Sequence, residues 1–200
     1  MSSRRARCLR VMAISWLAWM GIVVGCILAI VLMAWFVASR IYSRSNVAAQ
    51  QFDPTGPLPQ PIDLPDYTTG TWYEIARYPQ WFERNCKDVT ARYTTSPDGS
   101  SDAIRVENTC TDKTTGETRT AVGTAYPTER DGVLAVSFFP GVYGNYTVVK
   151  REPRLSIVSN PERSSLWVLS RDRTLEPQQW DAITDWLNAN QFNTQRLVMN

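Results

Sequence analysis

The 200-residue sequence contains two cysteines whose spacing predicts a covalent cross-link. Cys86 and Cys110 are equally distant from Asp98, which lies in the turn-forming stretch 96–99. In an antiparallel hairpin centred on that turn, the two residues face each other at a separation that suits a disulfide bond. We therefore expect a Cys86–Cys110 disulfide; the alternative is a pair of reduced, buried cysteines.

The sequence contains no histidine, and this restricts the chemistry that it can perform. Histidine is the commonest general base, the base of the usual serine and cysteine triads, and the commonest metal ligand. We therefore expect no metal site, no cofactor and no catalytic residue. Glu74 acting with a tyrosine is the one remaining acid–base candidate.

The sequence from residue 71 to residue 170 predicts short strands separated by turn sequences. Strands are predicted at 71–78, 89–95, 103–109, 118–126, 133–139, 146–150, 155–158 and 165–170. A helix is predicted at 176–190, where apolar residues recur at helical spacing, and a last short strand at 197–199. The expected fold is all-β. Consecutive strands joined by short turns favour a closed, eight-stranded antiparallel up-and-down β-barrel over a sandwich, because closure removes exposed strand edges.

The N-terminal segment has the composition of a membrane-spanning helix. No charged residue lies between Val11 and Ala38, and about 20 apolar residues span a bilayer core. Residues 11–38 are therefore predicted to form one transmembrane helix. Four arginines precede this segment and two follow it closely. The positive-inside rule thus places residues 1–10 in the cytoplasm and the main domain in the periplasm or outside the cell.

Cys26 leaves an alternative open for this anchor. Residues 23–26 resemble a bacterial lipobox, in which the cysteine is lipidated after cleavage. The ten residues after Cys26 are all apolar, however, whereas a processed lipoprotein continues into a polar tether. We expect an uncleaved helix with Cys26 as a small apolar residue in it.

Residues 39–66 are predicted to be a linker, because they contain five prolines and few large apolar side chains. Such a segment favours an extended conformation and acts as a semi-rigid spacer. The domain at 67–200 carries 15 basic and 16 acidic residues, so it is nearly neutral. A nucleic-acid partner is not expected, since it requires a concentrated basic face.

Residues 70–77, GTWYEIAR, resemble the G-x-W signature that opens the first strand of lipocalins, and in particular the bacterial lipocalin and apolipoprotein D branch. Further matching segments follow in order, and the resemblance covers roughly residues 66–200. It implies structural roles for three residues. Trp72 would close one end of the barrel, Arg171 would lie against its indole, and Gly70 would let the chain enter the barrel floor closely.

Alternation of side chains along these strands predicts which residues line the barrel. The expected lining residues are Glu74, Ala76, Tyr78, Val136, Phe138, Tyr146, Trp167 and Leu169. In the strand at 133–139 the opposite parity, with Ala135 and Ser137 inward, stays open. Glu74 is either a polar tether for a ligand headgroup or a member of an internal ion pair or hydrogen bond.

The resemblance implies a non-enzymatic, membrane-anchored protein that binds and stores or transports a small lipophilic ligand outside the cytoplasm. A fatty acid or a lysophospholipid is the expected ligand class. Two other classes stay open: a lipocalin-fold enzyme such as an isomerase acting on a hydrophobic substrate, and a structural barrel filled by its own side chains. The eight tryptophans are compatible with the last of these. Oligomeric state is not predicted.

Overall fold

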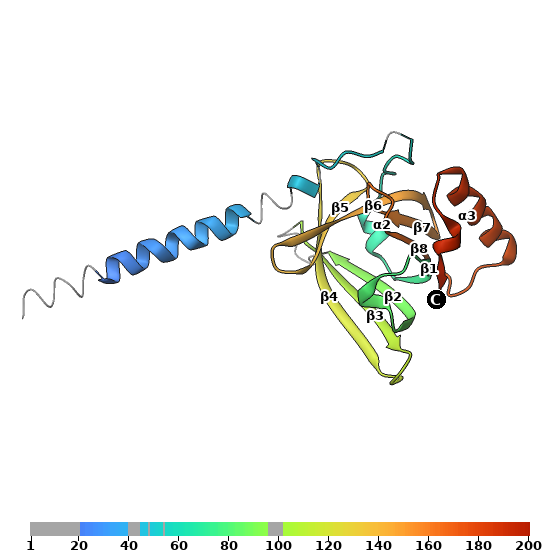
Figure 1. Cartoon of the computed structure of the whole chain (residues 1–200), viewed down its shortest axis with the longest axis horizontal. Coiled ribbons are helices and arrows are strands. Elements are labelled where there is room, and N and C mark those ends of the chain that lie inside the picture. The colour runs from blue at the N-terminus through green and yellow to red at the C-terminus, as the bar shows by residue number, and fades with distance from the viewer. Residues whose placement is uncertain (1–20, 40–44, 48, 54, 96–101) are drawn as a thin grey trace, which may run out of the picture. The chain divides into compact units, whose positions relative to one another are not determined.

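The structure is a computed structural model that describes residues 21–39, 45–47, 49–53, 55–95 and 102–200. The chain divides into two compact units, Met1–Tyr42 and Ser43–Asn200. The described part of the first unit is one helix, Gly21–Ser39, with a mean hydropathy of 2.7 (Figure 1). By length and composition this helix is able to cross a membrane. The rest of the expected span, residues 11–20, and the basic segment 1–10 lie outside the described residues.

The second unit is a closed antiparallel β-barrel (Figure 1). Its strands are β1 Thr71–Arg77, β2 Cys86–Thr95, β3 Ile104–Asp112, β4 Thr118–Pro127, β5 Val133–Phe139, β6 Val142–Glu152, β7 Leu155–Ser159, β8 Leu166–Ser170 and β9 Val198–Met199. Each strand from β1 to β8 pairs with the next one along the chain, and β8 pairs with β1 to close the sheet. The short β9 pairs with the end of β1. The predicted eight-stranded up-and-down barrel is confirmed.

Helical segments lie around the barrel. They include α2 Leu64–Thr68, the 3-10 turn η1 Trp81–Glu83, α3 Pro177–Ala189 and the 3-10 turn η2 Thr194–Arg196. The predicted C-terminal helix is α3, which begins after a capping box formed by Glu176 and Gln179. Its residues Ile183 and Leu187 are buried in an apolar cluster together with outward-facing barrel residues such as Ile157 and Val168.

The disulfide between Cys86 and Cys110 is confirmed, with their Cα atoms 5.4 Å apart. The residue paired with Cys86 across the ladder is Asp112, however, and not Cys110. The ladder pairs Thr95 with Ile104, so its register is offset from that of a hairpin centred on Asp98, and the bond is diagonal. A bulge at Asp88, whose φ is 52°, reduces this offset by one residue at Cys86. The ladder continues past this bulge through the pairs of Lys87 with Thr111 and Cys86 with Asp112, so β2 begins at Cys86, three residues before the predicted start.

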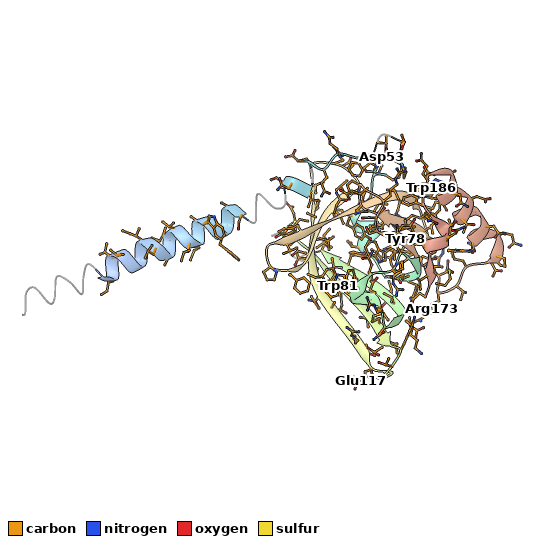
Figure 2. All side chains as sticks on the ribbon, viewed as in Figure 1. Asp53, Tyr78, Trp81, Glu117, Arg173 and Trp186 are labelled. Carbon is orange, nitrogen blue, oxygen red and sulfur yellow. A yellow bond between two sulfur atoms is a disulfide. The ribbon has the colours of Figure 1, made fainter. Side chains whose placement is uncertain are left out.

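Part of the predicted linker packs against the barrel. Val47 is buried beside Val133 and Ala135 of β5. Asp53, labelled in Figure 2, forms an ion pair with Arg163, which lies between β7 and β8. This packing differs from the extended spacer expected over 39–66. Apolar and charged side chains within the segment find partners on the barrel that its proline content does not reveal.

Candidate functional site

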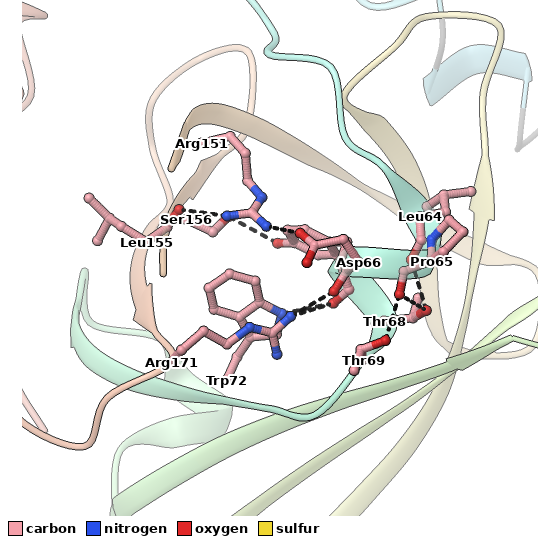
Figure 3. Close-up of polar contacts among 11 residues, drawn as sticks. Leu64, Pro65, Asp66, Thr68, Thr69, Trp72, Arg151, Leu155, Ser156 and Arg171 are labelled. Atoms are coloured by element: carbon pink, nitrogen blue, oxygen red, sulfur yellow. Dashed lines mark hydrogen bonds and ion pairs between the residues drawn. The ribbon is translucent and has the colours of Figure 1, made fainter. Parts of the chain in front are cut away.

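Trp72 closes one end of the barrel. Its side chain is fully buried, and its indole Nε1 donates a hydrogen bond to the Tyr67 carbonyl oxygen at 3.0 Å. The guanidinium carbon of Arg171 lies 3.7 Å from the indole centroid, so the two side chains stack (Figure 3). This stacking is the arrangement expected from the family resemblance.

Arg171 also ties the entering chain to the barrel floor. Its Nη2 donates to the carbonyl oxygens of Asp66 and Tyr67 at 2.9 and 3.2 Å (Figure 3). Gly70 has a φ of 74°, a left-handed backbone conformation that residues other than glycine rarely adopt. Gly70 therefore serves the turn that leads from α2 into Trp72.

The barrel interior beyond Trp72 is hollow. A cavity of about 220 Å³ lies among residues of β1, β2, β3, β5, β6, β8 and η1. Six of the eight predicted lining residues are on its wall: Glu74, Val136, Phe138, Tyr146, Trp167 and Leu169. The inward parity of β5 is thereby settled in favour of Val136 and Phe138.

The predicted lumenal positions of Ala76 and Tyr78 are wrong. A bulge in β1 between Glu74 and Ala76 shifts the register against β8, so the inward parity set by Trp72 ends at Glu74. Ala76 and Tyr78 belong instead to the apolar cluster between the sheet and α3. Between them in the sequence, Arg77 has a buried side chain that contacts Glu74, and Glu74 lines the cavity.

Several wall residues were not predicted. Phe82 and Glu83 come from η1, Tyr93 from β2 and Asn108 from β3. The pairing of Trp72 with Ala91 shows which parity of β2 faces inward, and Asn108 in turn pairs with Ala91. The sequence contains this alternation, but the strand register is needed to choose between its two faces.

A buried charge cluster forms one side of the cavity. Arg77 Nη1 lies 2.8 Å from Glu74 Oε1, and Arg77 Nε lies 3.3 Å from Glu83 Oε2. Arg77 Nη2 donates to the Glu83 carbonyl oxygen at 2.8 Å. Trp167 Nε1 donates to Glu83 Oε2 at 3.3 Å. Glu74 is thus a member of an internal ion pair, the second of its two expected roles.

Burial is the largest influence on the pKa values of the two glutamates in this cluster. Desolvation, together with the nearby charge of Glu83, raises the pKa of Glu74 to about 8, although Arg77 acts in the opposite direction. Burial also raises the pKa of Glu83, against the effects of Trp167 and Arg77. Near neutral pH, the raised pKa of Glu74 favours its protonated form, in which Oε1 still accepts the hydrogen bond from Arg77 Nη1.

Three tyrosine hydroxyls are connected at the inner end of the cavity. The hydroxyl of Tyr146 lies 2.6 Å from that of Tyr67 and 2.8 Å from that of Tyr93. Tyr67 also contacts the Ser156 hydroxyl at 3.0 Å. Burial raises the pKa of all three tyrosines, so their hydroxyls are neutral. They supply hydrogen-bonding capacity without charge.

The entrance of the cavity is apolar. Since β1 starts beside Trp72, the connection that follows β1 and contains η1 lies at the other end of the barrel. Phe82 and Phe138 line the cavity and are also partly exposed, so the cavity reaches the surface beside them. Trp81 and Phe139 are 75% and 62% exposed (Trp81 is labelled in Figure 2).

The described residues contain no group of three or more histidine, cysteine, aspartate or glutamate side chains that could hold a metal ion. The polar groups facing the cavity are carboxyl, amide and hydroxyl groups. Together with the aromatic and aliphatic wall, this arrangement suits an apolar guest held by a few polar contacts.

A closed eight-stranded barrel with a hollow interior, a tryptophan under an arginine at its floor and a helix packed on its outer face defines a lipocalin-type barrel. Residues 62–200 match the family model described as a lipocalin-like domain. The chain belongs to the lipocalin family.

The sequence relatives include bacterial lipoproteins. The chain is 37% identical to the outer membrane lipoprotein Blc of Vibrio cholerae over 134 residues, which cover 64% of this chain and 77% of the relative. It is 40% identical to the same-named protein of Escherichia coli K12 over 115 residues, covering 54% of this chain and 62% of the relative. The matched region thus spans less than two thirds of the E. coli protein.

Solved structures share the fold. The cockroach allergen Per a 4 superposes with a TM-score of 0.60 at 18% identity, covering 75% of this chain and 94% of the allergen. Insecticyanin from the tobacco hornworm Manduca sexta gives a TM-score of 0.56 at 18% identity, covering 75% and 85%. Japanin from Rhipicephalus appendiculatus, solved bound to cholesterol, gives 0.51 at 17% identity, covering 70% and 96%.

Proposed function

We propose that this chain is a membrane-anchored lipocalin that binds a small lipophilic ligand in the barrel cavity and stores or transports it outside the cytoplasm. The observation that carries the proposal is the cavity of about 220 Å³ above Trp72, with its largely aromatic and aliphatic wall. Ligand sites are typically concave and mostly apolar, with a few placed polar groups. Japanin, bound to cholesterol in its structure, is an example of the same fold holding an apolar molecule.

The size of the cavity supports a ligand with one slender apolar chain. Ligand pockets usually have volumes of about 300–1,000 Å³, and this one, at about 220 Å³, is smaller. A fatty acid or a lysophospholipid presents a single acyl chain, whereas a two-chain phospholipid needs more room. We therefore propose one of these single-chain classes.

The proposed location is the outer side of a cell membrane. The helix Gly21–Ser39 supports a single-pass anchor through residues 11–38, with residues 1–10 in the cytoplasm and the barrel in the periplasm or outside the cell. The name of the Vibrio cholerae relative, an outer membrane lipoprotein, supports a site beyond the cytoplasm. The Cys86–Cys110 disulfide supports an oxidising compartment.

Binding without catalysis is the favoured activity. Glu74, the acid–base candidate, is engaged by Arg77 and not by a tyrosine. The cavity also argues against a structural barrel filled by its own side chains. No separate observation favours an isomerase.

Uptake of a labelled lysophospholipid tests this proposal. The full chain, held in a non-ionic amphipol, is dialysed against palmitoyl lysophosphatidylcholine, and the bound fraction is measured. The variant Val136→Trp places an indole in the cavity, where Val136 lies between Ala125 and Gly144. The matched control is Val122→Trp, at an exposed position on β4.

We expect saturable uptake near one ligand per chain by the wild type and by Val122→Trp, and little uptake by Val136→Trp. Equal uptake by all three proteins would place the ligand outside the cavity and contradict the proposal.

A further inference from the structure

The polar groups of the cavity wall restrict the chemistry of the ligand's polar end. Of the described side chains that line the cavity, two are acidic, Glu74 and Glu83, and none is lysine or arginine. The cation in contact with these carboxyls is Arg77. A ligand anion in the cavity would therefore have to pair with Arg77.

Arg77 is held between the two glutamates. Its Nη1 lies 2.8 Å from Glu74 Oε1, its Nη2 donates to the Glu83 carbonyl oxygen at 2.8 Å, and its Nε lies 3.3 Å from Glu83 Oε2 without forming a hydrogen bond. The one guanidinium charge is thus shared by two carboxyl groups of the protein, and Arg77 is not itself among the residues that line the cavity. A ligand carboxylate would have to displace one of these contacts and leave a buried glutamate without its cation, which is costly.

Asn108 adds an independent observation. Its side-chain Oδ1 is buried and accepts no hydrogen bond within the described part of the chain, and the residue lines the cavity. An unpaired buried acceptor is unfavourable, and a donor on the ligand would satisfy it. A carboxylate carries no donor, whereas a hydroxyl or an ammonium group does.

The tyrosine hydroxyls at the inner end of the cavity add no positive charge that could pair with a ligand carboxylate. Tyr93 and Tyr146 are hydrogen-bonded to each other and are held neutral by burial. Lys113 exerts a charge effect on Glu74, but it is exposed and is not part of the cavity wall.

We propose that the polar end of the ligand inside the cavity is a neutral or cationic hydrogen-bond donor, such as a hydroxyl or an ammonium group, and not a free carboxylate. This inference rests on the proposed binding function. An ionised carboxylate would bury an unpaired charge beside Glu83. A hydroxyl or an ammonium group instead meets the acceptor of Asn108 and the carboxyl oxygens of Glu74 and Glu83.

Chain-matched ligands test this inference on the wild-type protein. The full chain in a non-ionic amphipol is dialysed at pH 7 against palmitate, methyl palmitate, 1-monopalmitoylglycerol and hexadecylamine, with Val136→Trp as the blocked-cavity background. All four carry the same 16-carbon chain and differ at the polar end. We expect monopalmitoylglycerol and hexadecylamine to bind at least about tenfold more tightly than palmitate.

The variant Asn108→Leu separates the donor contribution from the apolar contribution. Because it removes the unpaired acceptor, it should weaken monopalmitoylglycerol binding by about two- to tenfold. It should leave methyl palmitate, which has no donor, within about twofold of the wild type.

The outcomes distinguish this inference from the function on which it rests. Palmitate binding as tightly as monopalmitoylglycerol, above the Val136→Trp background, would overturn the inference and support the proposed function. Binding of none of the four ligands above that background would overturn the proposed function and the inference with it.

Discussion

Three ionisable side chains share one buried site in this barrel, and their mutual pairing is what makes the burial tolerable. Glu74, Arg77 and Glu83 are each at most 8% exposed. Isolated buried charges are strongly unfavourable, whereas a paired cluster that can also take up a proton is less so. The raised pKa of Glu74, about 8, expresses this compromise.

This protonation predicts how stability changes with pH. The folded state keeps the Glu74 proton up to about pH 8, whereas the unfolded chain releases it near its ordinary pKa of 4.5. The Glu74 contribution to the free energy of unfolding is therefore fully present below about pH 4.5 and is lost as the pH rises to about 8. Glu83, whose pKa is also raised, acts in the same direction.

The variant Glu74→Gln should remove part of this change of the free energy of unfolding with pH. Urea unfolding of wild type and variant at pH 5, 7 and 9 should show the variant gaining stability relative to the wild type as the pH rises. Parallel pH profiles would contradict the assigned protonation of Glu74.

The stacked cation at the floor gives a second prediction for a single residue. Arg171→Met keeps an apolar stem over Trp72 but removes the cation–π contact and the hydrogen bonds to residues 66 and 67. We expect a loss of about 1–3 kcal/mol in the free energy of unfolding, measured by urea titration. Arg173→Met, which removes a contact over the ring of Tyr73, is the matched control and should cost less. Equal losses would show that Arg171 has no special role.

At the scale of elements, strand register determines which side chains reach the cavity. Trp72 and Leu169 could be placed from the sequence because the family signature anchors them and simple alternation holds nearby. Ala76 and Tyr78 could not, because the bulge in β1 is set by pairing with β8 and leaves no clear mark in the sequence. The offset register of the β2–β3 hairpin likewise altered the expected facing of Cys86 without preventing the disulfide.

The disulfide is expected to stabilise the β2–β3 hairpin. It joins residues 24 apart in the sequence, and closing a loop of this size in the unfolded chain corresponds to about 3 kcal/mol. The double variant Cys86→Ser, Cys110→Ser should lose up to this amount in urea unfolding. The wild type treated with a reductant serves as the control and should show a similar loss. An unchanged unfolding midpoint would contradict a stabilising cross-link.

At the scale of the whole molecule, the order of strands and helix could be predicted from the sequence because turn residues and hydrophobic periodicity are local signals. The packing of the described residues at 45–47, 49–53 and 55–63 could not. It depends on contacts with distant partners, such as Asp53 with Arg163 and Val47 with Val133. The cavity itself also follows from long-range closure, since its wall combines six strands and η1.

The anchor is tested by the intact mass of the full-length protein purified from membranes. The helix continues through Cys26 to Ser39, and we expect residues 1–25 to be retained. A mass that lacks these residues and includes an added lipid would show lipobox processing at Cys26. The variant Cys26→Ser provides the control, because it cannot be lipidated and should keep the same membrane association as the wild type.

Native mass spectrometry of the mildly purified full-length protein tests the occupancy of the cavity most directly. We expect the wild type to carry one single-chain lipid per barrel and the Val136→Trp variant to carry none, while Val122→Trp behaves like the wild type. A ligand-free wild type that also takes up no added single-chain lipid, or the same lipid retained by Val136→Trp, would contradict the account.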